Sequence, residues 1–183
     1  LGYAEAVDGR ELGWRWWWSP HNEHRIPLPR LFLVPLLRLT GDFRAGMHLE
    51  VLVEAAVALA MILAARRLRG RTSFADAFFP LLWLSWSNVE ALLMMHMLSF
   101  VLPTAMTSAI LLWIATRSGP LTARDSVWIG ACLLGLPLCG GPGVTPAPAL
   151  ILWALYAVWN SFGSGADRRA GVIEMLVEIQ VDL

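Results

Sequence analysis

The stretch "MHLEVLVEAAVALAMILAA", residues 47–65, carries only two acidic side chains and ends abruptly in "RRLRGR", residues 66–71. A helix needs about 20 mostly apolar residues to cross a bilayer. This run therefore predicts a membrane-spanning helix that stops at a cluster of arginines. The composition agrees, because 57% hydrophobic residues, 15% charged residues and ten tryptophans in 183 positions are too apolar and too tryptophan-rich for an ordinary soluble domain.

Further apolar segments follow this first one along the chain. They cover residues 74–86, 91–116, 127–138 and 147–158, and the last two flank the glycine- and proline-rich sequence "CGGPGVTPAP". Segment 74–86 is short for a straight span, so we expect a re-entrant or broken helix there. Pro80 and Pro103 fit bent helices. The sequence thus predicts four to five membrane-inserted segments.

Arginine placement gives the orientation of these segments. If residues 47–65 run from outside to inside and each later segment crosses in turn, three connections on one side carry arginines: Arg66, Arg67, Arg69 and Arg71, then Arg117 and Arg124, then Arg168 and Arg169. The opposite connections, around residues 87–90 and 139–146, carry none. Short cytoplasmic loops are enriched in positive charge, so we expect residues 1–45 outside the cytoplasm.

The N-terminal region runs against that bias. It holds six arginines (Arg10, Arg15, Arg25, Arg30, Arg38 and Arg44), which five carboxylates almost balance (Glu5, Asp8, Glu11, Glu23 and Asp42). Arginines placed where topology disfavours them suggest a task other than orientation.

Several classes of protein are disfavoured by simple counts. The net charge is zero and all fourteen basic residues are arginine, so there is no broad basic field for nucleic acid. The two cysteines, Cys132 and Cys139, lie inside or at the end of an apolar run, which predicts buried thiols and no disulfide framework. The start at Leu1 and the amphipathic end "AGVIEMLVEIQVDL" suggest a fragment.

The stretch "WWWSPHNEHRIPLPR", residues 16–30, is the densest group of chemically versatile side chains. Its prolines favour an extended or turned backbone, so we expect its polar residues on a loop. The tryptophans are typical of a membrane interface. After them, "RLFLVPLLRLT", residues 30–40, predicts a helix along the interface with arginines reaching toward headgroups. Asp42 is expected to cap the first span.

Three interpretations of this loop stay open. It is a solvated interfacial loop, or a divalent-metal site built from His21, Glu23 and His24, whose donor types allow it. In the third interpretation, Glu23 is a general base or an orienting carboxylate, and Arg25 with Arg30 binds a phosphate by charge-assisted hydrogen bonds.

Ionisable residues inside the apolar segments form a second group. Glu50 and Glu54 stand one helical turn apart in the outer half of the first span, with His48 nearby. Glu90 lies in an outward connection, and His96 follows a turn or two further in. Each of them either pairs with another helix or faces a functional cavity. The predicted topology brings them to the same side as the loop, which favours a site.

The sequences "WWWSPHNEHRIPLPRLFLVPLLRLTGDFRAGMHLEV" and "ARRLRGRTSFADAFFPLLWLSWSNVEALL" resemble bacterial polytopic membrane proteins with an HNEHR loop. These are similar to GT-C type glycosyltransferases, which use polyprenyl-phosphate sugars. The likeness covers residues 14–116. It departs after Glu90, where Ala91 and methionines replace the group's tryptophan and glutamine, which puts a role for Glu90 in doubt.

The resemblance implies roles for particular residues. Glu23 would deprotonate the acceptor hydroxyl, with Asp42 as its rival, and Arg25 and Arg30 would stabilise the departing lipid phosphate. His21, Asn22, His24 and Glu90 complete the set of expected phosphate- or substrate-binding residues. A divalent metal is compatible with this set, but no cofactor is demanded.

Together these observations predict an all-α fold, a fragment of a polytopic transmembrane helical bundle with an extracytoplasmic loop and an interfacial helix. We expect the extracytoplasmic loop and interfacial helix over residues 1–45, transmembrane helices over 46–160, and a cytoplasmic connection with the start of a further helix over 161–183. The expected location is the bacterial inner membrane. The expected function is transfer of a sugar from a polyprenyl-phosphate carrier on the outer face, with membrane lipids and that carrier as partners. A transporter or flippase component and a non-catalytic membrane subunit are the alternatives.

Overall fold

The structure, a computed structural model, describes residues 3, 12–21, 24–85, 93–117 and 122–162, and these are mostly helical. The helices are α2 (Trp14–Trp17), α3 (Pro27–Thr40), α4 (Arg44–Arg69), α5 (Phe78–Trp83), α7 (Leu98–Thr116), α8 (Ala123–Gly135), α9 (Gly141–Val144) and α10 (Ala147–Phe162). Short 3-10 helices are η1 (Phe74–Ala77), η3 (Met95–Met97) and η4 (Pro137–Cys139). A two-stranded hairpin of β1 (Pro20–His21) and β2 (His24–Arg25) precedes α3. The predicted all-α class is therefore confirmed for the described residues.

Two of the described helices are long and apolar enough to cross a membrane, Arg44–Arg69 and Met95–Thr116. They coincide with the predicted segments 47–65 and 91–116. The other predicted segments are helical too, but shorter: η1 and α5 together cover 74–83, α8 has 13 residues and α10 has 16. A straight span needs about 20 residues, so the described part of the chain offers two helices of spanning length.

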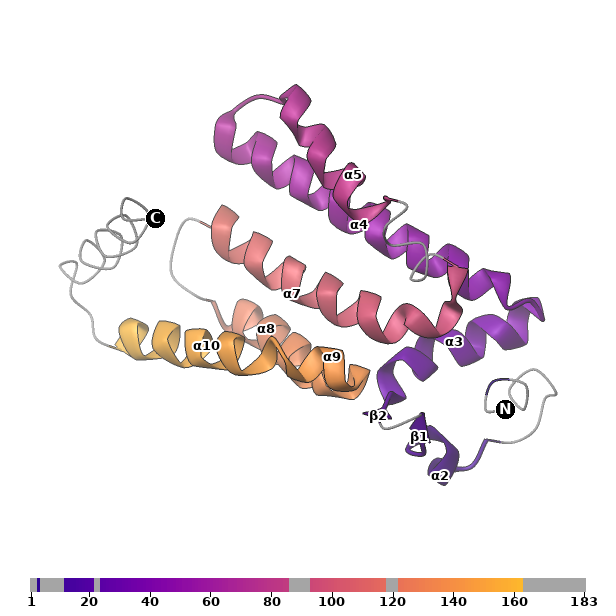
Figure 1. Cartoon of the computed structure of the whole chain (residues 1–183). Coiled ribbons are helices and arrows are strands. Elements are labelled where there is room, and N and C mark those ends of the chain that lie inside the picture. Colours follow the sequence, from indigo (N-terminus) through magenta and orange to yellow (C-terminus); the bar gives the residue numbers. More distant parts are fainter. Residues whose placement is uncertain (1–2, 4–11, 22–23, 86–92, 118–121, 163–183) are drawn as a thin grey trace.

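The helices α4 and α7 form the centre of the arrangement (Figure 1). Both start on the side of the bundle where α3 lies and run in the same general direction, because α5 folds back along α4 before the chain enters α7. On the other side of α7 lie α8, α9 and α10. The arginine-rich end of α4, the end of α7 and the start of α8 lie on the left in Figure 1, and the hairpin, α3 and α9 lie on the right.

Two apolar clusters hold these layers together. One joins α7 to the following helices through Ile110, Leu136, Ala147 and Leu150. The other joins α3 to α7 through Leu33, Leu98 and Val101, with Leu49 and Val53 of α4 packed against it. Complete burial of a leucine stabilises a fold by about 1.5–3 kcal/mol. The burial of Leu33 therefore holds α3 on the bundle.

Helix ends follow from local chemistry. Gly41 ends α3 and Gly70 ends α4, both with left-handed backbone at φ 64° and 74°, which glycine adopts without steric cost. Between the two helices, the Asp42 carboxylate Oδ1 accepts a hydrogen bond of 2.8 Å from the Arg44 backbone N–H. Asp42 therefore stabilises the entry into α4 from one residue before the N-cap, which is Phe43 and not Asp42 as the sequence predicted.

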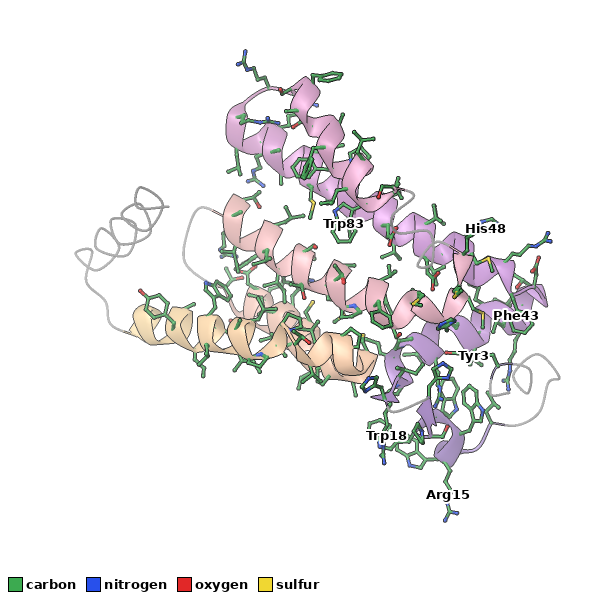
Figure 2. All side chains as sticks on the ribbon, in the orientation of Figure 1. Tyr3, Arg15, Trp18, Phe43, His48 and Trp83 are labelled. Atoms are coloured by element: carbon green, nitrogen blue, oxygen red, sulfur yellow. The ribbon has the colours of Figure 1, made fainter. Side chains whose placement is uncertain are left out.

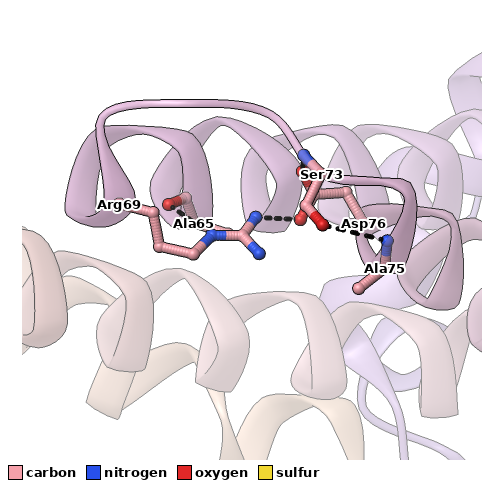
Figure 3. Close-up of polar contacts among 5 residues, drawn as sticks. All are labelled: Ala65, Arg69, Ser73, Ala75 and Asp76. Atoms are coloured by element: carbon pink, nitrogen blue, oxygen red, sulfur yellow. Dashed lines mark hydrogen bonds and ion pairs between the residues drawn. The ribbon is translucent and has the colours of Figure 1, made fainter.

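The arginine-rich turn after α4 is ordered by one carboxylate (Figure 3). Asp76 accepts a 2.8 Å hydrogen bond from the Ser73 backbone N–H and forms an ion pair with Arg69. Ser73 in turn accepts from the Ala75 N–H at 3.3 Å, completing a capping box at the start of η1. The Ser73 N–H and the Arg69 guanidinium together lower the pKa of Asp76.

Candidate functional site

The HNEHR loop contains the hairpin of β1 and β2, which packs against the helical bundle. Its register pairs Pro20 with Arg25 and His21 with His24. Asn22 and Glu23, the predicted substrate contact and base, lie outside the described residues. His24 and Arg25 are exposed, whereas Ile26 directly after them is 3% exposed and anchors the hairpin.

The hairpin meets the glycine-rich connection before α9, more than a hundred residues further along the chain. A Cβ built on Gly141 would lie 2.9 Å from Cε1 of His24, and one on Gly140 would lie 3.2 Å from the His24 Cβ. Gly140 also has a positive φ of 95°. The two glycines thus leave the space that the His24 imidazole occupies.

Arg30 fastens the tryptophan segment to α3. The side chain is only 4% exposed, and its Nη1 donates to the backbone carbonyl oxygens of Trp16 at 2.6 Å, Ser19 at 2.8 Å and Trp17 at 3.2 Å. Its guanidinium carbon lies 4.8 Å from the centre of the Trp16 ring. These carbonyls lie at the end of a short helix, where carbonyl oxygens are natural acceptors for a cation. The Trp16 oxygen also accepts from the Ser19 backbone N–H at 3.2 Å and from the Ser19 hydroxyl at 2.7 Å. Arg30 therefore reaches inward, whereas the sequence suggested that it would reach toward headgroups.

Tyr3 and two histidines lie beside the contact between Arg30 and the tryptophan segment. The ring of Tyr3 lies 6.4 Å from that of Trp16 and 6.1 Å from that of His21, and His21 lies 6.2 Å from His96, all between ring centres. Burial raises the pKa of Tyr3, and neighbouring Arg30 opposes that rise. Burial, followed by the positive charge of Arg30 and then His96, lowers the pKa of His21. His21 is therefore a neutral imidazole at neutral pH, able to donate and accept one hydrogen bond each.

The predicted acidic pair lies deeper, in the first half of α4. Glu50 is 0% exposed and Glu54 is 4% exposed. Both oxygens of Glu50 and Oε2 of Glu54 have no hydrogen-bond partner among the described residues. The Leu98 backbone amide faces the Glu50 carboxyl without reaching hydrogen-bonding geometry. His48, two residues before Glu50, is exposed and does not join the pair (Figure 2).

A glycine explains how α7 approaches this pair. Gly46 is buried one turn before Glu50, and a Cβ built on it would lie 2.5 Å from the Cβ of Met95 and 3.2 Å from Leu33 Cδ2. The backbone of η3 can therefore pack directly on α4, which places His96 and Leu98 beside the first turns of α4.

The structure brings only part of the predicted set together. His21 and Arg30 interact, and His24 and Arg25 flank the hairpin turn beside them. Asp42 is exposed just before α4, and its carboxylate accepts the Arg44 backbone N–H. Glu90 lies outside the described residues, as do Asn22 and Glu23. Within the described ranges, no group of three or more His, Cys, Asp and Glu side chains gathers to hold a metal ion.

Two features escaped sequence reasoning. Tyr3 carries no motif, and only the folded chain shows its contact with Trp16 and His21. The Gly140–Gly141 pair did carry a signal, since adjacent glycines often mark a close approach of backbone to another group. Cys139 is fully buried and Cys132 half-buried, both as free thiols, as their apolar setting predicted.

The chain matches no protein-family model, no curated protein and no solved structure, so its function has to be argued from its own residues.

Proposed function

We propose that the chain is a polytopic integral membrane protein that transfers a sugar from a polyprenyl-phosphate carrier at the outer face of the bacterial inner membrane. The observation that supports this most is the seating of the HNEHR hairpin at the end of the bundle opposite the arginines of the α4 turn and of the α7–α8 connection. A polar hairpin held there meets lipid headgroups while its base is anchored in protein.

The roles follow from what is exposed and what is already engaged. Glu23, between His21 and His24, takes the proton from the acceptor hydroxyl. The hydroxyl oxygen then bonds to the anomeric carbon, and the bond from that carbon to the phosphate oxygen breaks. Its electron pair stays on the polyprenyl phosphate. Arg25 is exposed on β2 and stabilises that leaving group, whereas Arg30 has one nitrogen committed to the tryptophan segment and positions the hairpin.

The test uses the full chain in lipid nanodiscs with a short polyprenyl-phosphate hexose labelled in the sugar. Release of label from the lipid is measured for the wild type and for Glu23→Gln, Arg25→Ala and the control Arg15→Ala, an exposed arginine of α2. We expect Glu23→Gln to abolish release, Arg25→Ala to raise KM, and the control to behave as wild type. Undiminished release by Glu23→Gln would remove the base and with it this mechanism.

A second candidate function is transport, and the burial of Glu50 and Glu54 favours it. Transporters place ionisable side chains inside spanning helices along the substrate path. In that case, uptake into proteoliposomes would be lost in Glu50→Gln or Glu54→Gln, while Glu23→Gln would leave it intact.

A further inference from the structure

We propose that Glu50 and Glu54 form a proton-binding pair, which together holds at least one proton at neutral pH in the first half of α4. This inference does not depend on glycosyl transfer, because it concerns neither Glu23 nor the hairpin.

Burial without partners is the first argument. Three of the four carboxyl oxygens of the pair, both of Glu50 and Oε2 of Glu54, are shielded from solvent and have no hydrogen-bond partner among the described residues. An ionised carboxylate in such a place loses its hydration, and the Leu98 backbone amide that faces Glu50 does not make up that loss, so the group becomes neutral by taking up a proton.

Spacing is the second argument. Residues four apart on a helix are neighbours on one face, so Glu50 and Glu54 lie side by side. Two negative charges at that separation in an apolar setting repel each other, and one proton removes the repulsion. The proton also turns one carboxyl into an O–H donor that its neighbour on the same helix face can accept.

The charges around the pair do not neutralise it. The two ion pairs among the described residues are Arg69–Asp76 and Arg117–Asp125, and neither involves Glu50 or Glu54. The elements packed on α4 contribute few titratable groups: Arg30 and the exposed Arg38 from α3, His96 from η3, Asp76 from η1 at the far end, and none from α5 or α7.

An independent observation comes from Tyr3, which lies beside Arg30 and near Glu50. Arg30 is more than nine-tenths buried, and its Nε has no hydrogen-bond partner among the described residues. The Tyr3 hydroxyl lies next to it, is also buried and unpartnered within the described chain, and is close enough to feel the charge of Glu50. The Tyr3 hydroxyl thus lies close to Glu50 without a hydrogen-bond partner among the described residues, and a protonated Glu50 carboxyl can donate a hydrogen bond to it.

Infrared spectroscopy of the full chain in nanodiscs tests the proposal, because a protonated carboxyl has a carbonyl stretch separate from that of a carboxylate. We expect the wild type to show this band at neutral pH and the double variant Glu50→Gln/Glu54→Gln to lose it. Asp42→Asn, which removes an exposed carboxylate, should leave the band in place.

A measurement on the unaltered chain covers the case in which the double variant does not fold. Carbon-13 labelling of glutamate carboxyls should shift the wild-type band, while the same labelling of aspartate should not. Absence of the band from the wild type at neutral pH overturns the proposal. Its persistence in a folded double variant, or insensitivity to glutamate labelling, does so too.

Discussion

Substitution of Arg30 should weaken the attachment of the tryptophan segment to α3. Its two shortest hydrogen bonds, to the carbonyl oxygens of Trp16 and Ser19, are 2.6 and 2.8 Å long. Hydrogen bonds to a charged group contribute about 1.5–3 kcal/mol each. A cation over a tryptophan ring adds about 0.5–2 kcal/mol. The terms are not fully additive, since one nitrogen serves several acceptors, so we expect Arg30→Ala to destabilise the attachment of the tryptophan segment by about 4 kcal/mol.

Arg30→Lys should have a stability between those of the wild type and Arg30→Ala, with a destabilisation of about 2 kcal/mol, because an ammonium group keeps the charge but lacks the planar fork of the guanidinium. The loss is local, since Arg30 joins residues 16–19 to α3 while α4 and α7 pack on each other independently. Hydrogen exchange resolves such local opening.

Hydrogen–deuterium exchange with mass spectrometry is therefore the assay, read on peptides that cover residues 13–21. A destabilisation of about 4 kcal/mol corresponds to about a thousandfold loss of protection, limited by the protection that the segment has in the wild type. Peptides from α7 should be unchanged, and Arg44→Ala, an exposed arginine at the start of α4, serves as the control. Protection of residues 13–21 within threefold of wild type in Arg30→Ala would refute the conclusion that Arg30 holds the tryptophan segment on α3.

Three further results are expected. Gly46→Ala should lower the free energy of unfolding in detergent by about 1–3 kcal/mol, because the new Cβ would overlap Met95. The control Gly130→Ala has open space around the new Cβ and should be neutral or stabilising. Equal effects of the two substitutions would contradict the close packing of η3 on α4. The Thr122 hydroxyl, aided by Arg117, lowers the pKa of Asp125 to about 2. The contribution of Asp125 to the start of α8 is therefore present above the unfolded value of about 3.9 and is lost as pH falls toward 2. Titration of the Asp125 carboxyl near 4 in the folded chain, followed by NMR, would disprove it. In a background without native cysteines, Arg15→Cys should react with a membrane-impermeant maleimide added outside intact cells and Thr72→Cys should not, and labelling of both from one side would contradict the topology.

Much of the candidate site was within reach of sequence reasoning, but in pieces. The non-helical backbone of residues 20–21 and 24–25, the hydrogen bond of Asp42 at the entry to α4, and the position of Glu50 and Glu54 one turn apart in a long apolar helix all follow from neighbours in the chain, and the described residues agree. Their arrangement did not follow, because it depends on contacts between segments far apart in sequence.

The sequence by itself determined where the helices are. Long apolar runs produce α4 and α7, glycine ends α3 and α4, and the Ser73–Asp76 capping box starts the turn into α5. These signals are local, since a helix is closed by hydrogen bonds within four residues, and a capping side chain acts within the first turn.

Only the tertiary structure decided the environment of the charged groups. The same arginine chemistry leaves Arg25 exposed on the hairpin and buries Arg30 on the next element, because the fold brings the backbone carbonyls of Trp16 and Ser19 within hydrogen-bonding distance of Arg30. Likewise, the seat of His24 is made by glycines from a distant connection. Whether a polar group is solvated, paired or left without a partner depends on which surfaces meet in three dimensions, and composition and spacing along the chain do not encode that directly.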